Sequence, residues 1–218
     1  QFFVKPGTQK DWYEHWKETR LKWHKSLGMG DENYRFHDHD KLAHYADAAS
    51  DIYEGILTLA VAEPGTEVSA ENGAQILDLG NQLRADHSGT VYALFGSLFS
   101  AQQQVRTDDL AAAEESLQWI LDNQKDGMFD KTDEGLILTA SLRLGRVILA
   151  QGDAERALSL INNLDPKTFE PGFAELRGDV YLAMGRLVDA REAYQAAQQA
   201  GSNSGGLRMK LDDLSAES

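Results

Sequence analysis

Apolar and small residues recur along most of the chain three or four positions apart, which is the spacing of one face of an α-helix. Two stretches, beginning at Ser141 and Ala174, carry the same pattern with an offset of 33 residues. Glycines, alanines and larger apolar residues match between them: Gly145 with Gly178, Ile148 with Tyr181, Gly152 with Gly185, Ala157 with Ala190, and Ile161 with Tyr194. The second half of the chain is therefore predicted to consist of repeated helical units.

The period and residue types of this pattern are typical of helix–turn–helix repeats of the tetratricopeptide kind. Another copy lies upstream at residues 92–121, where Ala101, Asp108 and Ala113 stand in place of a helix glycine, the turn glycine and a helix alanine. Its offset from the next copy is 44 residues, so about eleven residues at 123–133 form an inserted loop. The predicted fold is all-α: a tetratricopeptide-like array of helical hairpins, an α-solenoid, with an N-terminal helical extension.

Local signals set the ends of the predicted helices. Asp11, Asp40 and Ser69 are N-cap residues, and the proline and glycine of "EPGTE" end the second helix. A short strand is predicted at 34–37 and a flexible joint at 201–206. The predicted helices cover residues 11–27, 40–62, 69 up to a turn at 86–89, 92–105, 110–121, 133–150, 154–164, 171–184, 187–200, and 207–214, the last as a terminal cap or tail.

The repeated residues are predicted to pack the array. Small residues let paired helices approach closely, and turn glycines adopt a positive φ at little cost. Larger residues fill the gaps between neighbouring pairs. The predicted packing residues are Ala101, Ala113, Gly145, Gly152, Ala157, Gly178, Tyr181, Gly185, Ala190 and Tyr194.

A binding surface is predicted on the concave side of the array, which the first helix of each pair forms. Its mixed apolar and polar character suits an extended peptide or a partner helix. It is not a cluster of lysines and arginines for a terminal carboxylate, and an ordinary solvated groove is the alternative. The predicted partner-binding residues are Leu98, Gln102, Arg106, Leu142, Arg146, Leu149, Glu175, Asp179 and Leu182.

Composition narrows the classes of function. A net charge of −14 argues against binding nucleic acid or anionic lipid, and the absence of cysteine excludes disulfides and thiolate sites. No phosphate-binding loop or nucleophile elbow occurs, so we predict no catalytic residue, no cofactor and no enzymatic activity. No run of about 18 apolar residues is present. Without an initiator Met or a signal peptide, Gln1 is expected to be a cut end.

The first 48 residues differ from the rest in composition, with three of the four tryptophans and five of the six histidines. This change predicts two domains, 1–50 and 51–218. The run His37, His39, Asp40 and His44 carries side chains that can bind a metal ion. Because only Asp40 and His44 have the spacing of ligands on one helix, His37 and His39 lie before the predicted helix, and no zinc-protease motif is present, we predict a polar loop and helix cap there and no metal.

Residues 50–214 resemble the YfgM family, the tetratricopeptide-like ancillary subunit of the bacterial SecYEG translocon. The resemblance is carried by "ASDIYEGIL", "VYALFGSLFSAQQQVRTDDLAAAEESLQWIL", "LRLGRVILAQGDAERALSLI", "ELRGDVYLAMGRLVDAREAYQAA" and "LRMKLDDL". It implies an inner-membrane protein with one N-terminal spanning helix, which this sequence lacks, and a soluble domain that faces the periplasm. It further implies association with the translocon and with the chaperone-like PpiD, and a part in handling exported proteins.

Residues 2–51 are similar to a different family, glycyl-tRNA synthetase. The similarity is carried by "FFVKPGTQKDWYEHWKETRLKWHKSLGM" and "ENYRFHDHDKLAHYADAASDI". It implies a piece of a class II catalytic domain just beyond the second signature motif, with Asp40 or Lys41 nearest to an acidic residue that holds the glycine amino group. The arginine-bearing ATP motifs, the remaining sheet and the anticodon domain are absent from the sequence.

A fragment of a split active site does not hold reactants in place for adenylation. We therefore hypothesise a chimaera, either a borrowed segment or a cloning or assembly artefact, with a divergent natural extension as the alternative. The predicted function is a non-catalytic protein-interaction scaffold on the periplasmic side of the inner membrane. The alternatives are a synthetase-related protein and a generic tetratricopeptide adaptor.

Overall fold

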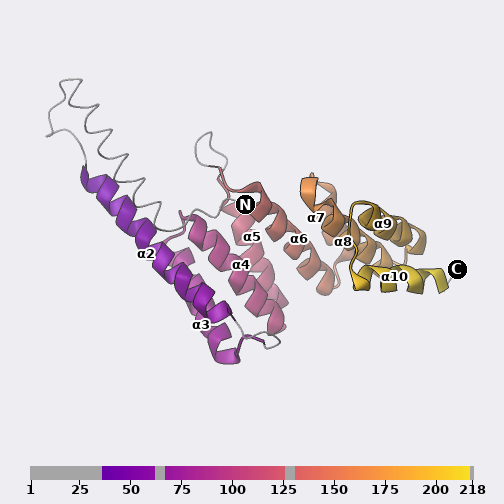
Figure 1. Cartoon of the computed structure of the whole chain (residues 1–218), viewed down its shortest axis with the longest axis horizontal. Helices are drawn as coiled ribbons and strands as arrows, with labels where there is room; N and C mark the ends of the chain where they lie inside the picture. Colours follow the sequence, from indigo (N-terminus) through magenta and orange to yellow (C-terminus); the bar gives the residue numbers. More distant parts are fainter. Residues whose placement is uncertain (1–35, 62–66, 126–130, 217–218) are drawn as a thin grey trace, which may run out of the picture. The chain divides into compact units, whose positions relative to one another are not determined.

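The computed structural model describes residues 36–61, 67–125 and 131–216, and the side chains of all these except 36–43 and 215–216. These residues confirm the predicted all-α class. The elements (Figure 1) are α2 (Phe36–Ala60), α3 (Ala70–Asp86), α4 (Val91–Arg106), α5 (Leu110–Asp122), α6 (Glu134–Ala150), α7 (Ala154–Asn162), the 3-10 helix η2 (Lys167–Phe169), α8 (Glu170–Ala183), α9 (Leu187–Gln199) and α10 (Gly205–Ala216).

The chain divides into two compact units, residues 1–45 and 46–218. In the first unit the structure describes only the beginning of α2, so the predicted helix at 11–27 lies outside the described residues. In the second unit, from α3 to α10, helices that follow one another in the chain pack against each other. The α8 helix also packs against α6, as expected where one hairpin stacks on the next.

One turn recurs between the two helices of each predicted hairpin. Its central residue has a positive φ in all three copies, 61° at Asp108, 89° at Gly152 and 74° at Gly185. The next N–H bonds to a carbonyl five residues back, as in a Schellman motif. These bonds join Asp109 to Gln104 at 2.8 Å, Asp153 to Ile148 at 3.2 Å, and Arg186 to Tyr181 at 2.8 Å.

Glycines lie where helices approach closely, both within a hairpin, as between α8 and α9, and between hairpins, as between α6 and α8. A Cβ at Gly178 would lie 2.3 Å from the Tyr194 ring, and one at Gly145 would lie 2.8 Å from Leu176. Of the ten predicted packing residues, the turn glycines Gly152 and Gly185 are exposed and Tyr181 is half-buried. The other seven are buried: Ala101, Ala113, Gly145, Ala157, Gly178, Ala190 and Tyr194.

The start of α2 differs from the prediction. The helix begins at Phe36, so the strand predicted at 34–37 is wrong for its last two residues, and Asp40 lies inside the helix rather than at its N-cap. Aspartate is a favoured N-cap residue, but this preference is a local one that does not fix where a helix starts. Because neither glycine nor proline occurs between Phe36 and Glu54, nothing in the sequence stops the helix from extending toward its N-terminus.

At the C-terminus the helix predicted at 207–214 is present and begins two residues earlier, within the segment predicted as a flexible joint. A turn at Gly201, with φ of 108°, is followed by Ser204, whose Oγ accepts the N–H of Leu207 at 3.0 Å. Gly205 and Gly206, the last two residues of the predicted joint, begin α10 instead. Leu207 and Leu214 are buried in a cluster with residues of α8 and α9, so α10 packs on the last hairpin as a cap.

Candidate functional site

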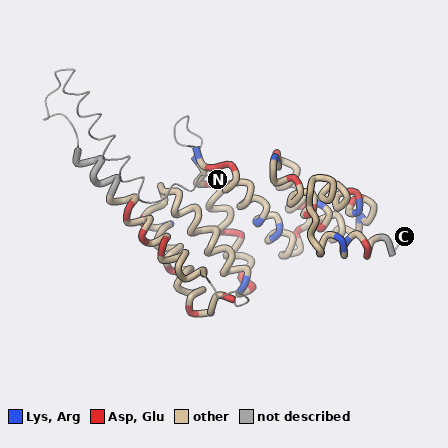
Figure 2. Tube along the Cα trace, in the orientation of Figure 1, with Lys and Arg blue, Asp and Glu red and all other residues tan. Residues whose placement is uncertain are grey.

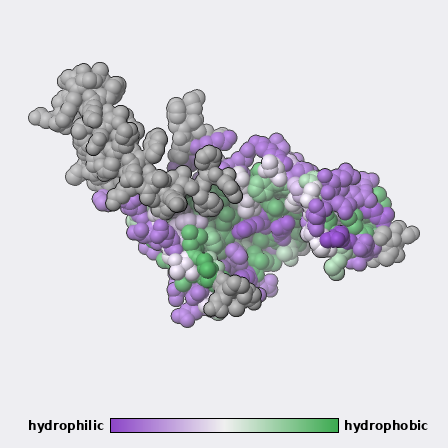
Figure 3. All heavy atoms as spheres, in the orientation of Figure 1, coloured by the Kyte–Doolittle hydropathy of each residue, from purple (hydrophilic) through white to green (hydrophobic). Residues whose placement is uncertain are grey.

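A pocket of about 310 Å³ opens between α4, α5 and α6. Six of its ten lining residues are apolar, which gives it a hydrophobic interior. Figure 3 shows hydrophobic surface around α6, interrupted by hydrophilic side chains. The lining residues are Ala101, Gln102, Val105, Arg106, Leu110, Leu117, Arg143, Arg146, Val147 and Ala150.

Three of the lining residues are arginines, and Figure 2 shows basic positions on α6 in a chain whose charged residues are mostly acidic. Arg106 has partners within the chain: its Nη1 donates to Oε1 of Gln103 at 2.6 Å and its Nη2 to the carbonyl of Val68 at 2.5 Å. Among the residues that the structure describes, neither Arg143 nor Arg146 has a hydrogen bond or an ion pair. At the pocket, two exposed cations therefore have no counterion among the described residues.

The two unpaired arginines affect each other. They lie three residues apart on α6, so their side chains project from the same face. Partial burial lowers the pKa of the Arg143 guanidinium, and the positive charge of Arg146 lowers it further. Both effects oppose the charged form, and an anion bound between the two side chains would offset them.

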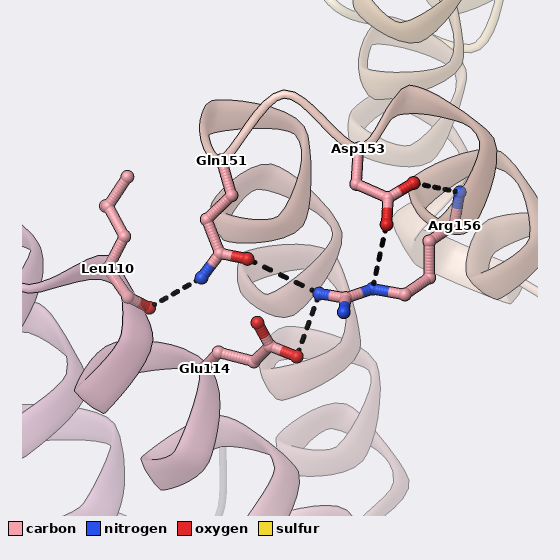
Figure 4. Close-up of polar contacts among 5 residues, drawn as sticks. All are labelled: Leu110, Glu114, Gln151, Asp153 and Arg156. Atoms are coloured by element: carbon pink, nitrogen blue, oxygen red, sulfur yellow. Dashed lines mark hydrogen bonds and ion pairs between the residues drawn. The ribbon is translucent and has the colours of Figure 1, made fainter.

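Polar contacts fix the walls of the pocket relative to one another (Figure 4). The carbonyl of Leu110 accepts a hydrogen bond from Nε2 of Gln151 at 3.0 Å. Nη2 of Arg156 lies 2.8 Å from Oε1 of Glu114 and 3.4 Å from Oε1 of Gln151. These contacts join α5 to the C-terminal end of α6 and to the first turn of α7, so the first hairpin is held against the second.

Only three of the nine predicted partner-binding residues line the pocket: Gln102, Arg106 and Arg146. Leu98 is buried, while Leu142 and Leu149 are half-buried against the same core, so these three mainly pack the array. Leu182 is 41% exposed on α8, away from the pocket lining. Arg143 was not among the predicted partner-binding residues, although its spacing of three residues from Arg146 puts both on one helix face.

The two acidic residues of α8 that were predicted to bind a partner, Glu175 and Asp179, already pair with a side chain of α10. Nζ of Lys210 lies 2.6 Å from Oδ1 of Asp179 and 3.1 Å from Oε1 of Glu175. The hydroxyl of Tyr194 donates to Asp179 at 2.7 Å, and burial followed by this hydrogen bond raises the pKa of Tyr194 well above its usual range. Partial burial opposes the charge of Lys210, but the two carboxylates raise its pKa. Glu175 and Asp179 thus hold α10 in place.

The metal alternative gains no support from the described residues. They contain no group of three or more histidine, aspartate or glutamate side chains placed to hold a metal ion. His44 is exposed, whereas the side chains of His37, His39, Asp40 and Lys41 lie outside the described part of the chain. Among the described helices, none is both long enough and apolar enough to cross a membrane.

Several curated relatives are glycine–tRNA ligases. The ligase of Chlorobaculum tepidum is 55% identical over 53 residues, which are 24% of this chain and 11% of the ligase. That of Corynebacterium glutamicum is 46% identical over 54 residues, which are 24% of this chain and 12% of the ligase. That of Mycobacterium bovis is 29% identical over 181 residues, 81% of this chain and 38% of the ligase. The resemblance to glycyl-tRNA synthetase is therefore partial, because the chain spans less than two fifths of each of these relatives.

No solved structure matches the chain significantly. A family profile described as "Tetratricopeptide repeat-like domain" matches residues 29–216, which include every helix from α2 to α10. The repeated turns and the small residues between paired helices are the structural features expected of such a domain. The chain belongs to the tetratricopeptide repeat-like domain family.

Proposed function

We propose that this protein is a non-catalytic scaffold that binds other proteins through the pocket between α4, α5 and α6. The observation that carries the proposal is this pocket, which has an apolar interior and two arginines without partners among the described residues, on a fold of stacked helical hairpins. Tetratricopeptide-like arrays present extended surfaces to other chains. An apolar pocket beside charged groups suits a peptide or a helix of a partner.

We further propose that the scaffold is the periplasmic domain of an ancillary subunit of the Sec translocon. The support is the resemblance of residues 50–214 to the YfgM family. In this proposal the protein lies at the periplasmic side of the bacterial inner membrane, where SecYEG and a PpiD-like chaperone are its partners. Its role there is to assist newly exported proteins.

Co-purification tests the translocon proposal. The full chain is fused behind one membrane-spanning helix and expressed in a bacterium that lacks its own YfgM-family gene. After gentle solubilisation of the membranes, SecY, SecE, SecG and PpiD are expected to co-purify with it. The control is the same anchor fused to an unrelated periplasmic domain. Equal recovery of these proteins with the control would contradict the proposal.

The second candidate function is that of a protein related to glycyl-tRNA synthetase. The observation that favours it is the 55% identity over 53 residues to the ligase of Chlorobaculum tepidum. Glycine-dependent exchange of pyrophosphate into ATP decides between the two functions. We expect none for the purified chain, and exchange above the level without glycine would overturn the non-catalytic proposal. A generic tetratricopeptide adaptor would show neither exchange nor translocon subunits.

A further inference from the structure

The dimensions of the pocket fit side chains of a peptide. Its volume of about 310 Å³ is at the lower end of the range for ligand sites, about 300–1,000 Å³. Val105 on its wall is 46% exposed, so apolar surface there still faces water. Covering that surface with an apolar side chain is favourable because it removes both groups from water.

The positive charge at the pocket indicates which charged groups the ligand carries beside its apolar side chain. Elsewhere among the described residues of the second unit, several cations pair with carboxylates of the chain, including Arg156, Lys167, Arg177, Arg186 and Lys210. Arg143 and Arg146 have no such partner among the described residues. A guanidinium matches the geometry of a carboxylate and is weakly hydrated, so these two side chains are suited to acidic groups from outside.

Non-specific electrostatic attraction by the protein as a whole would not explain the binding of an acidic ligand. At a net charge of −14, the protein as a whole repels acidic segments and attracts basic ones. Affinity for an acidic segment therefore has to come from direct contacts at the pocket. The pocket is also held in shape before a partner arrives, because Gln151 holds Leu110 and Arg106 bonds to Gln103 and Val68. Such preorganisation lowers the cost of binding.

We infer that the pocket binds an internal acidic segment of a partner protein. An apolar side chain of the segment enters the space between α4, α5 and α6, and neighbouring carboxylates pair with Arg143 and Arg146. The inference rests on the proposed scaffold function and names the chemistry of its partner.

Fluorescence anisotropy with the full chain tests this inference. The probe is a labelled peptide with two leucines between glutamates, blocked at both ends so that it has no terminal carboxylate. Reversing both charges with Arg143→Glu and Arg146→Glu is expected to weaken binding at least tenfold, since attraction of the peptide's carboxylates becomes repulsion at both positions. The matched control is Arg208→Glu, which reverses an exposed arginine of α10 and is expected to leave binding within about twofold.

Variants of the probe separate the two parts of the ligand. A peptide with glutamine in place of glutamate and one with serine in place of leucine are each expected to bind at least tenfold more weakly. Equal binding of the glutamine peptide, or stronger binding of a lysine peptide, would overturn the inference. An equal loss with Arg208→Glu would do the same. Circular dichroism verifies folding, and Arg143→Gln, which leaves the other arginine in place, replaces the double variant if that variant unfolds.

Two further combinations of results distinguish a failure of this inference from a failure of the proposed function. If the double variant still co-purifies with the translocon while the wild-type chain does not bind the acidic peptide, the inference fails and the scaffold function stands. If the peptide binds as expected but no translocon subunit is recovered, the inference stands and the translocon role fails. Sedimentation that shows a dimer of the wild-type chain and a monomer of the double variant would make a second copy the occupant, which also overturns the inference.

Discussion

The region around α4, α5 and α6 and the region around α8, α9 and α10 are built from the same hairpin repeat but differ in their polar surface. In the first, Arg143 and Arg146 border a pocket and lack partners among the described residues. In the second, Lys210 of α10 pairs with Asp179 and Glu175. The comparison shows that the packing residues of the repeat set the fold, whereas the neighbouring element decides which of its charges remain available to a partner.

The substitution with the largest expected effect on stability removes the buried side chain of Tyr194 from the second region. Tyr194 is fully buried, and its hydroxyl donates to Asp179. Tyr194→Ala is expected to lower the free energy of unfolding by about 3–5 kcal/mol, because it leaves a cavity. Urea denaturation measures the loss. Tyr194→Phe, which keeps the ring, is expected to cost about 1–3 kcal/mol, and an equal loss in both variants would contradict the assignment of Tyr194 as a packing residue.

Overpacking tests whether both regions depend on the same small residues. Ala157 and Ala190 are fully buried at equivalent positions of two hairpins. Replacing either by tryptophan is expected to lower the unfolding free energy by about 1–3 kcal/mol or more, since the helices have no room for the ring. Thermal melting measures the effect, and the exposed Ala196 supplies the control Ala196→Trp. Unchanged melting at Ala157 or Ala190 would contradict the repeat alignment.

The recurring turn offers a smaller test. Gly152→Ala places a Cβ on a residue with φ of 89°, which is expected to cost about 1–2 kcal/mol. Asp108 has the same role in the first hairpin with φ of 61°, and aspartate tolerates this conformation. Asp108→Gly is therefore expected to change stability by less than about 1 kcal/mol. Differential scanning calorimetry compares the two variants, and a larger loss with Asp108→Gly would show that the turns are not equivalent.

The smallest expected effect concerns the ion pair that joins the first two hairpins. The side chains of Arg156 and Glu114 are 47% and 29% exposed, so Arg156→Ala is expected to cost less than about 1 kcal/mol. Lys210→Ala is expected to cost more, because its half-buried carboxylate partners would lose their cation. A double-mutant cycle for each pair, followed by urea denaturation, measures the difference. A larger coupling energy for Arg156 with Glu114 than for Lys210 with its carboxylate partners would contradict this order.

Much of the fold could be predicted from the sequence because its signals are local. The capping residue Ser69, together with the turn glycines and the repeat spacing, placed most helix ends in the repeats within one or two residues of those observed. The start of α2 was missed because Asp40 is a good capping residue that the helix passes over. The helix at 207–214 was predicted as either a cap or a tail, and local signals could not decide between them, because a cap depends on burial of Leu207 and Leu214 against other helices.

The candidate site was harder to predict because it depends on which helices meet. The repeat alignment placed Gln102, Arg106 and Arg146 in a binding surface, and these residues line the pocket. It placed Leu142 rather than Arg143 in that surface, because the repeat period alone does not show which face of α6 another hairpin covers. It treated Glu175 and Asp179 as available for partners, because their pairing with Lys210 spans more than thirty residues of sequence.

The position of α10 has a consequence for self-association. Stacked repeats can grow without limit when one end of a chain fits the other end of the next, and such growth produces filaments. Here Leu207 and Leu214 occupy the apolar surface that α8 and α9 would otherwise offer to a further hairpin. The α10 helix therefore leaves that surface unavailable for head-to-tail stacking of another copy.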